Sequence, residues 1–148
     1  MDLLENPAIL RQIIMDHYQY PRNKSLVVDP NYHKIHMASE SCIDDFTIQV
    51  LIENEVIQDI RYDGIGCTIS TAALSILSEL LKGKSQNEAL EIIDEYYAMI
   101  HEADYHKEKL AEAIVFANVG KQANRIKCAT IGANGIKMLV KGEVNGEE

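Results

Sequence analysis

After about residue 62 the apolar residues of this chain change from an alternating spacing to a helical one, and that change limits the folds that the chain can adopt. Between residues 46 and 62 they alternate with polar residues, which predicts two β-strands joined by a short turn at Asn54-Glu55. From residue 68 onward they recur every three to four residues, which predicts helices. Strands followed by helices along one chain indicate an α+β fold. The expected strands are 46–52 and 56–62, and the expected helices are 68–82, 85–100, 107–117 and about 125–141.

An N-terminal helix and a third strand complete the predicted elements. Asn6 followed by Pro7 favours a helix start, and Pro21 ends that helix. A weaker alternation predicts a strand at about 34–39. We therefore expect a small three-stranded antiparallel sheet packed against about five helices, with the N-terminal helix first.

The length of 148 residues suits one domain with its own core. We expect that domain to span 1–148, with a helix and loop in about 1–25 and a flexible tail at 142–148. Glycines 132 and 135 weaken the prediction of the last helix, since each costs about 1 kcal/mol relative to alanine.

Composition limits the classes of partner. A net charge of −9 argues against nucleic acid, which requires a basic face. The longest apolar stretch, 71–81, is interrupted by polar residues and argues against a membrane span. The acidic first residues do not resemble an export signal, so we expect a cytoplasmic protein. Thiols stay reduced there, and three cysteines do not suit a disulfide framework.

Each cysteine lies at the boundary of a predicted element: Cys42 before a strand, Cys67 before a helix and Cys128 at the start of the last helix. Three thiols and one nearby carboxylate form a complete tetrahedral ligand set for Zn²⁺. A helix N-terminus stabilises a thiolate, and Gly64 and Gly66 would let the backbone pass close to a metal. Spacing alone fits three small buried side chains equally well, because the paired C-x₂-C motifs of zinc fingers are absent.

Four motifs, in the same order along the chain, resemble those of the U-type iron–sulfur assembly proteins, and within them the SufU branch. The motifs are residues 14–23 (IMDHYQYPRN), 42–44 (CID), 64–70 (GIGCTIS) and 125–129 (RIKCA). The resemblance extends from Leu10 to about Leu139. Lys127 stands where scaffold-type IscU members carry histidine, and the additional helical segment at about 85–105 is typical of SufU-like members.

The resemblance implies that Cys42, Asp44, Cys67 and Cys128 bind a metal, with Zn²⁺ as the cofactor and iron or a transient [2Fe–2S] cluster as the alternative. It also implies the function of a zinc-dependent sulfurtransferase. A SufS-like cysteine desulfurase would deliver persulfide sulfur to Cys42, for use by a downstream iron–sulfur assembly scaffold. The alternatives are a non-enzymatic scaffold that builds a [2Fe–2S] cluster and a purely structural zinc domain.

Two residues are therefore the expected catalytic ones. Cys42 lies in a loop, and its release from zinc by ligand exchange would free a nucleophilic thiolate, whereas Cys67 and Cys128 are anchored by helices. Arg125 would offset the negative charge of the site and hold a persulfide or carboxylate in a fixed geometry. Lys127 fits a solvated helix start equally well.

One position departs from the family pattern. The family usually has glycine between the first cysteine and the aspartate, and this chain has Ile43. If the backbone there needs a positive φ, a β-branched residue costs about 1–2 kcal/mol, and Asp45 becomes the substitute for Asp44. His33 and His36 are alternative ligands.

We expect His17, on the apolar face of the first helix, to be a packing residue. His101 and His106 are expected on the surface.

Overall fold

The structure is a computed structural model that describes residues 6–39 and 43–142. The elements in chain order are α1 (Pro7–Gln19), β1 (His33–Ala38), β2 (Asp45–Glu53), β3 (Val56–Ile65), α2 (Thr68–Leu81), α3 (Gln86–Ile100), the 3₁₀ segments η2 (Lys107–Lys109), η3 (Ala111–Phe116) and η4 (Val119–Lys121), and α4 (Ala123–Lys141). The predicted α+β architecture, with a three-stranded antiparallel sheet and the N-terminal helix first, is confirmed.

The sheet has the order β1-β2-β3. Asn54 and Glu55 have φ angles of 55° and 65°, which two-residue hairpin turns require, so the predicted turn between β2 and β3 is confirmed. The prediction that the sheet ends at residue 62 was wrong. β3 continues three residues further, and its last residue, Ile65, lies opposite Asp45, the first residue of β2.

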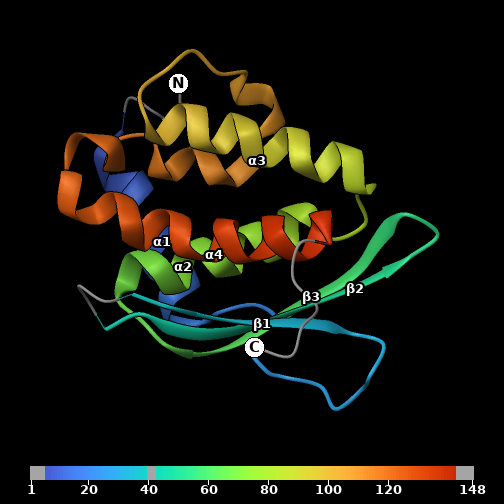
Figure 1. Cartoon of the computed structure of the whole chain (residues 1–148). Helices are drawn as coiled ribbons and strands as arrows, with labels where there is room; N and C mark the ends of the chain where they lie inside the picture. The colour runs from blue at the N-terminus through green and yellow to red at the C-terminus, as the bar shows by residue number, and fades with distance from the viewer. Residues whose placement is uncertain (1–5, 40–42, 143–148) are drawn as a thin grey trace.

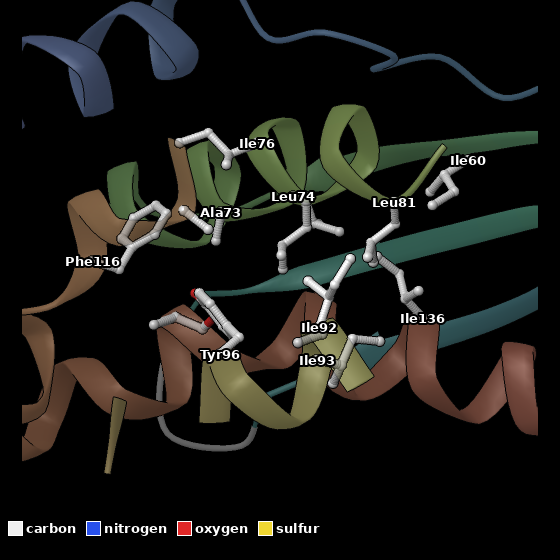
Figure 2. Packing of buried hydrophobic residues seen from close by; sticks show 14 of the residues in the cluster. Ile60, Ala73, Leu74, Ile76, Leu81, Ile92, Ile93, Tyr96, Phe116 and Ile136 are labelled. Carbon is white, nitrogen blue, oxygen red and sulfur yellow. The ribbon is translucent and has the colours of Figure 1, made fainter. Parts of the chain in front are cut away.

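The helices cover one face of the sheet (Figure 1). Helices α2 and α4 contact the strands, and α3 packs on α4. Between them lies one apolar core, in which Figure 2 shows Leu74 of α2 and Ile92 of α3 in the same interior space. Tyr96 and Phe116 meet edge to face there, with ring centroids 6.2 Å apart. Within the described ranges, no helix has the combination of length and hydropathy that a bilayer span requires.

Helix α4 runs without interruption through the two glycines that weakened its prediction. A Cβ atom added to Gly132 would lie 2.5 Å from a methyl carbon of Leu74, and one added to Gly135 would lie 2.7 Å from Cδ1 of Ile48. The glycines therefore let α4 pack closely on α2 and on the sheet. This packing offsets their low helix propensity.

The α-helix predicted at 107–117 was wrong in type, because this segment forms short 3₁₀ helices instead. Leu110, Ala113, Phe116 and Val119 are buried at intervals of three residues. Side chains three residues apart are eclipsed in a 3₁₀ helix, with three residues per turn, so Ala113 and Phe116 lie on the same side of η3.

The motif at residues 14–23 attaches α1 and the following loop to α2. His17 is buried, with Nδ1 2.7 Å from the hydroxyl of Ser75 and Nε2 2.8 Å from a carboxylate oxygen of Glu112. The backbone N–H of Arg22 also donates to the Ser75 hydroxyl, and the Asn23 amide donates to Ser78. The expectation that His17 is a packing residue is confirmed.

Candidate metal centre

Three of the proposed ligands meet where the strand ends approach the helices. One ligand atom each from Asp44, Cys67 and Cys128 lies within 4.8 Å of the other two. Asp44 immediately precedes β2, Cys67 immediately precedes α2, and Cys128 lies on α4. The ends of β2 and β3 are paired, and this pairing brings Asp44 beside Cys67 although 23 positions separate them.

Cys67 caps the N-terminus of α2. Its Sγ accepts a hydrogen bond from the backbone N–H of Ser70 at 3.5 Å, as a serine or aspartate cap would. The N–H groups at a helix start are thus available to donate hydrogen bonds to a metal-bound sulfur. The predicted position of Cys67 directly before a helix is confirmed.

Asp44 is almost fully buried, with 1% of its surface exposed. Its Oδ1 accepts hydrogen bonds from the backbone N–H of Cys67 at 3.1 Å and from the hydroxyl of Ser70 at 2.8 Å. Asp45, the substitute considered from the sequence, is exposed, and its carboxylate lies 2.7 Å from Nε2 of His36. The carboxylate that lies with the thiols is therefore that of Asp44.

Gly64 and Gly66 permit close approach of protein groups rather than of a metal. Gly64 has a φ of +144°, and a Cβ there would lie 2.1 Å from the carbonyl oxygen of Asp45. A Cβ on Gly66 would lie 2.4 Å from both the Phe46 ring and the Ser70 hydroxyl. The two glycines let the end of β3 close onto β2 and onto the first turn of α2.

Cys128 does not lie at the start of a helix as predicted. Helix α4 begins at Ala123, so Cys128 is its sixth residue and lies beyond the four N–H groups that a helix start leaves without intrahelical partners. Its side chain reaches the site from the second turn, on the buried side of α4. The helix-start argument therefore applies to Cys67 and not to Cys128.

Cys42, the fourth proposed ligand, lies outside the described residues. The described chain resumes at Ile43, whose side chain is exposed, and Asp44 follows it into the buried site. The φ angle of Ile43 depends on Cys42, so the expected cost of a β-branched residue there stays a prediction.

Arg125 and Lys127 are both exposed and line different hollows. Arg125, in the first turn of α4, lines a groove of about 290 Å³ that also includes Arg11 and Ile69. Lys127 lines a hollow between α4 and the end of β1, together with Ser39. Both cations belong to the segment 113–142, which contains five lysines and arginines and no acidic residue.

The histidines considered as ligands lie apart from this group. His36 pairs with Asp45, His17 is enclosed by Ser75 and Glu112, and His33 is exposed on β1. Over the part of the chain that the structure describes, Asp44, Cys67 and Cys128 are the group of cysteine, histidine and acidic side chains close enough to share a metal ion.

The residues present suit a zinc ion. Zinc accepts cysteine sulfur at about 2.3 Å and carboxylate oxygen at about 2.1 Å, so tetrahedral ligands lie roughly 3.5–3.8 Å apart. The present spread of up to 4.8 Å needs movements of about one ångström to reach that spacing. Both helix-borne thiols and the buried carboxylate are deprotonatable donors of the kind that zinc prefers.

Ser70 is the site residue to which sequence analysis gave no role. It is fully buried, and it contacts both Asp44 and Cys67. A local signal existed, because Ser70 follows the capping Cys67 by three residues, the position at which a side chain reaches back over a helix start. Its bond to Asp44 depends on the tertiary fold.

Comparison with known proteins identifies relatives of this chain. A family model described as the NifU-like N-terminal domain matches residues 9–129. The zinc-dependent sulfurtransferase SufU of Bacillus subtilis is 30% identical, over 94% of each chain. The iron–sulfur cluster assembly scaffold protein IscU of Streptococcus pyogenes is 31% identical, over 91% of this chain and 84% of the relative.

Solved structures share the fold. A hypothetical protein solved at 2.3 Å resolution superposes with a TM-score of 0.84 at 29% identity, over 92% of this chain and 99% of the other. A SUF-system assembly scaffold protein from Fervidobacterium islandicum gives a TM-score of 0.81 at 24% identity, over 86% and 93%. The chain belongs to the NifU-like N-terminal domain family.

Replacing Asp44 with alanine should weaken zinc binding far more than replacing Asp45, because the Asp44 carboxylate lies with the thiols. A ligand present at about 100 times its Kd stabilises the folded state by about 2.7 kcal/mol. We set the zinc concentration at about 100 times the Kd of wild type and measure the free energy of unfolding in urea. Zinc should raise it by this amount for wild type and Asp45→Ala, and by much less for Asp44→Ala. An equal loss in both variants would contradict the assignment of Asp44.

Proposed function

We propose that this protein is a zinc-dependent sulfurtransferase that accepts persulfide sulfur from a cysteine desulfurase for iron–sulfur cluster assembly in the cytoplasm. The observation that carries the proposal is the convergence of Asp44, Cys67 and Cys128 at one partly buried point. The name of the Bacillus subtilis relative, which matches over almost its whole length, supports it.

Four residues would hold the zinc ion in this proposal: Cys42, Asp44, Cys67 and Cys128. When bound, zinc keeps the thiols deprotonated at neutral pH and neutralises part of their charge. The protein holds two of these ligands in fixed positions. Cys67 is fixed by the start of α2 and Cys128 is buried on α4, so both are suited to remain in place.

Cys42 is the proposed acceptor because the sequence predicts a loop for it before a strand, whereas helices anchor Cys67 and Cys128. The Cys42 thiolate attacks the terminal sulfur of the donor's cysteine persulfide. The S–S bond of the donor breaks, its cysteine departs as a thiolate, and Cys42 becomes the persulfide. One sulfur atom moves between two cysteines, with no net oxidation or reduction.

Arg125 is the proposed partner of the incoming sulfur. It is the third residue of α4, where the helix dipole disfavours a cation, so helix stability does not explain its charge. Three thiolates and one carboxylate around a divalent cation leave a net charge of about −2, which a nearby guanidinium would offset. Arg125 can also donate two parallel hydrogen bonds to an anionic group.

A second candidate function is a non-enzymatic scaffold for a [2Fe–2S] cluster. The Streptococcus pyogenes relative, named as a scaffold, is as similar to this chain as the sulfurtransferase is. Cysteines and an aspartate also suit iron. Lys127 favours the sulfurtransferase. The scaffold-type members that this chain resembles carry histidine at this position, immediately before the last cysteine.

The metal content and the effect on a desulfurase separate the two functions. The protein is purified without added iron, its metals are measured, and it is added to a cysteine desulfurase whose alanine production is followed. We expect equimolar zinc and faster alanine production. A brown protein with visible charge-transfer bands and no stimulation would contradict the sulfurtransferase and support the scaffold.

Loss of Cys42 should abolish sulfur acceptance. After incubation with desulfurase and cysteine, the wild-type peptide that contains Cys42 should gain the mass of one sulfur atom, and Cys42→Ala protein should gain none at any cysteine. The assignment would be wrong if Cys42→Ala accepted sulfur as wild type does while Cys67→Ala did not.

Removal of the Arg125 guanidinium should slow sulfur acceptance without releasing zinc. A hydrogen bond to a charged group contributes about 1.5–3 kcal/mol, so Arg125→Gln should accept sulfur roughly 10- to 100-fold more slowly. The matched control is Lys121→Gln, which removes a cation of the same segment that lies 4.0 Å from Glu102. Equal rates for the two variants would remove Arg125 from the mechanism.

A further inference from the structure

The hydroxyl of Ser70 lies between two proposed metal ligands. It is 2.8 Å from Oδ1 of Asp44 and 3.5 Å from Sγ of Cys67, and it is fully buried. The same residue also donates its backbone N–H to the Cys67 sulfur. Because Cys67 N–H donates to Asp44 in turn, the first turn of α2 supplies three hydrogen bonds to these two ligands.

The Ser70 hydroxyl has one hydrogen to donate, and it donates that hydrogen bond to the Asp44 carboxylate. The other acceptor within its reach, the carbonyl oxygen of Cys67, lies further away, at 3.2 Å, and in the 3.5 Å contact with the Cys67 sulfur the Ser70 oxygen is the acceptor. A hydrogen bond to a carboxylate is shorter and roughly twice as strong as one between neutral groups. The position is also closely confined, since a Cβ on Gly66 would lie 2.4 Å from the Ser70 oxygen.

We propose that Ser70 is a positioning residue that fixes the Asp44 carboxylate to the start of α2, so that Asp44 and Cys67 act as one preformed unit of the metal site. The inference rests on the ligand set of the proposed function.

Asp44 needs such a fixed partner because of its place in the chain. It is separated from the proposed sulfur acceptor, Cys42, by one residue. Without an anchor, a displacement of Cys42 would be transmitted to Asp44 through that short connection. The bonds from Ser70 and Cys67 tie the carboxylate to the start of α2 instead, so the position of Asp44 does not depend on that connection alone.

A double-mutant cycle on zinc affinity tests this role. Zinc binding is measured by competition with a chromophoric chelator for wild type, Ser70→Ala, Asp44→Ala and the double variant. Loss of a group that orients a metal ligand typically costs 10- to 100-fold in affinity, and we expect this loss for Ser70→Ala. Because Ser70 acts through Asp44, adding Ser70→Ala to Asp44→Ala should change the affinity less than threefold.

A spectroscopic measurement and a matched variant exclude a general effect on folding. In the cobalt-substituted protein, Ser70→Ala should alter the d–d bands in the same direction as Asp44→Ala. Ser78→Ala removes another buried hydroxyl from the same helix, one that donates to the Ser75 carbonyl, and it should bind zinc as wild type does.

The proposal is overturned if Ser70→Ala binds zinc as tightly as wild type, or if it loses the same factor with and without Asp44. Failure of the proposed function has a different signature. A wild-type protein that binds zinc but accepts no sulfur would contradict the sulfurtransferase, while the affinity cycle would still report the role of Ser70.

Discussion

The pairing of the ends of β2 and β3 determines where the candidate site can form. Asp45 lies opposite Ile65, so Asp44 comes beside Cys67, and the hydrogen bond between them joins the sheet to the start of α2. The two-residue turn at Asn54-Glu55 pairs Ile52 with Ile57, and a one-residue register shift between Leu51 and Ile52 then gives the pairing of Asp45 with Ile65. A shift by one residue would turn Phe46 away from the core and separate the carboxylate from the thiols.

The family motifs serve two different purposes in this fold. The residues around His17 hold α1 and its loop on α2 through the buried hydroxyl of Ser75, and none of them belongs to the metal group of the described chain. The later motifs supply Asp44, Cys67 and Cys128. The first motif therefore stabilises the fold, and the later motifs provide the candidate metal ligands.

The fold was predictable where the signals were local. The Asn6 cap, the Asn54-Glu55 turn and the Ser85 cap each act within a few residues, and the element ends that adjoin them were confirmed within one or two residues. The start of α4 was predicted at about residue 125 and lies at Ala123, because Gln122 provides no side-chain cap to mark it. The role of Ser70 could not be derived, because its partner Asp44 is 26 positions away and the bond exists only after the sheet and α2 have packed.

The 3₁₀ run between α3 and α4 has a consequence for local opening of the molecule. Its i→i+3 hydrogen bonds have poorer geometry than those of an α-helix, and it carries Glu112, the carboxylate partner of His17. Native proteins open in cooperative units of unequal stability, and segments with weak internal bonding exchange their amide hydrogens first. Opening of 107–121 would leave the imidazole of His17 without that partner while the described metal ligands, at the starts of β2 and α2 and on α4, keep their places. The amide hydrogens of 107–121 can therefore exchange with solvent while the candidate metal site stays intact.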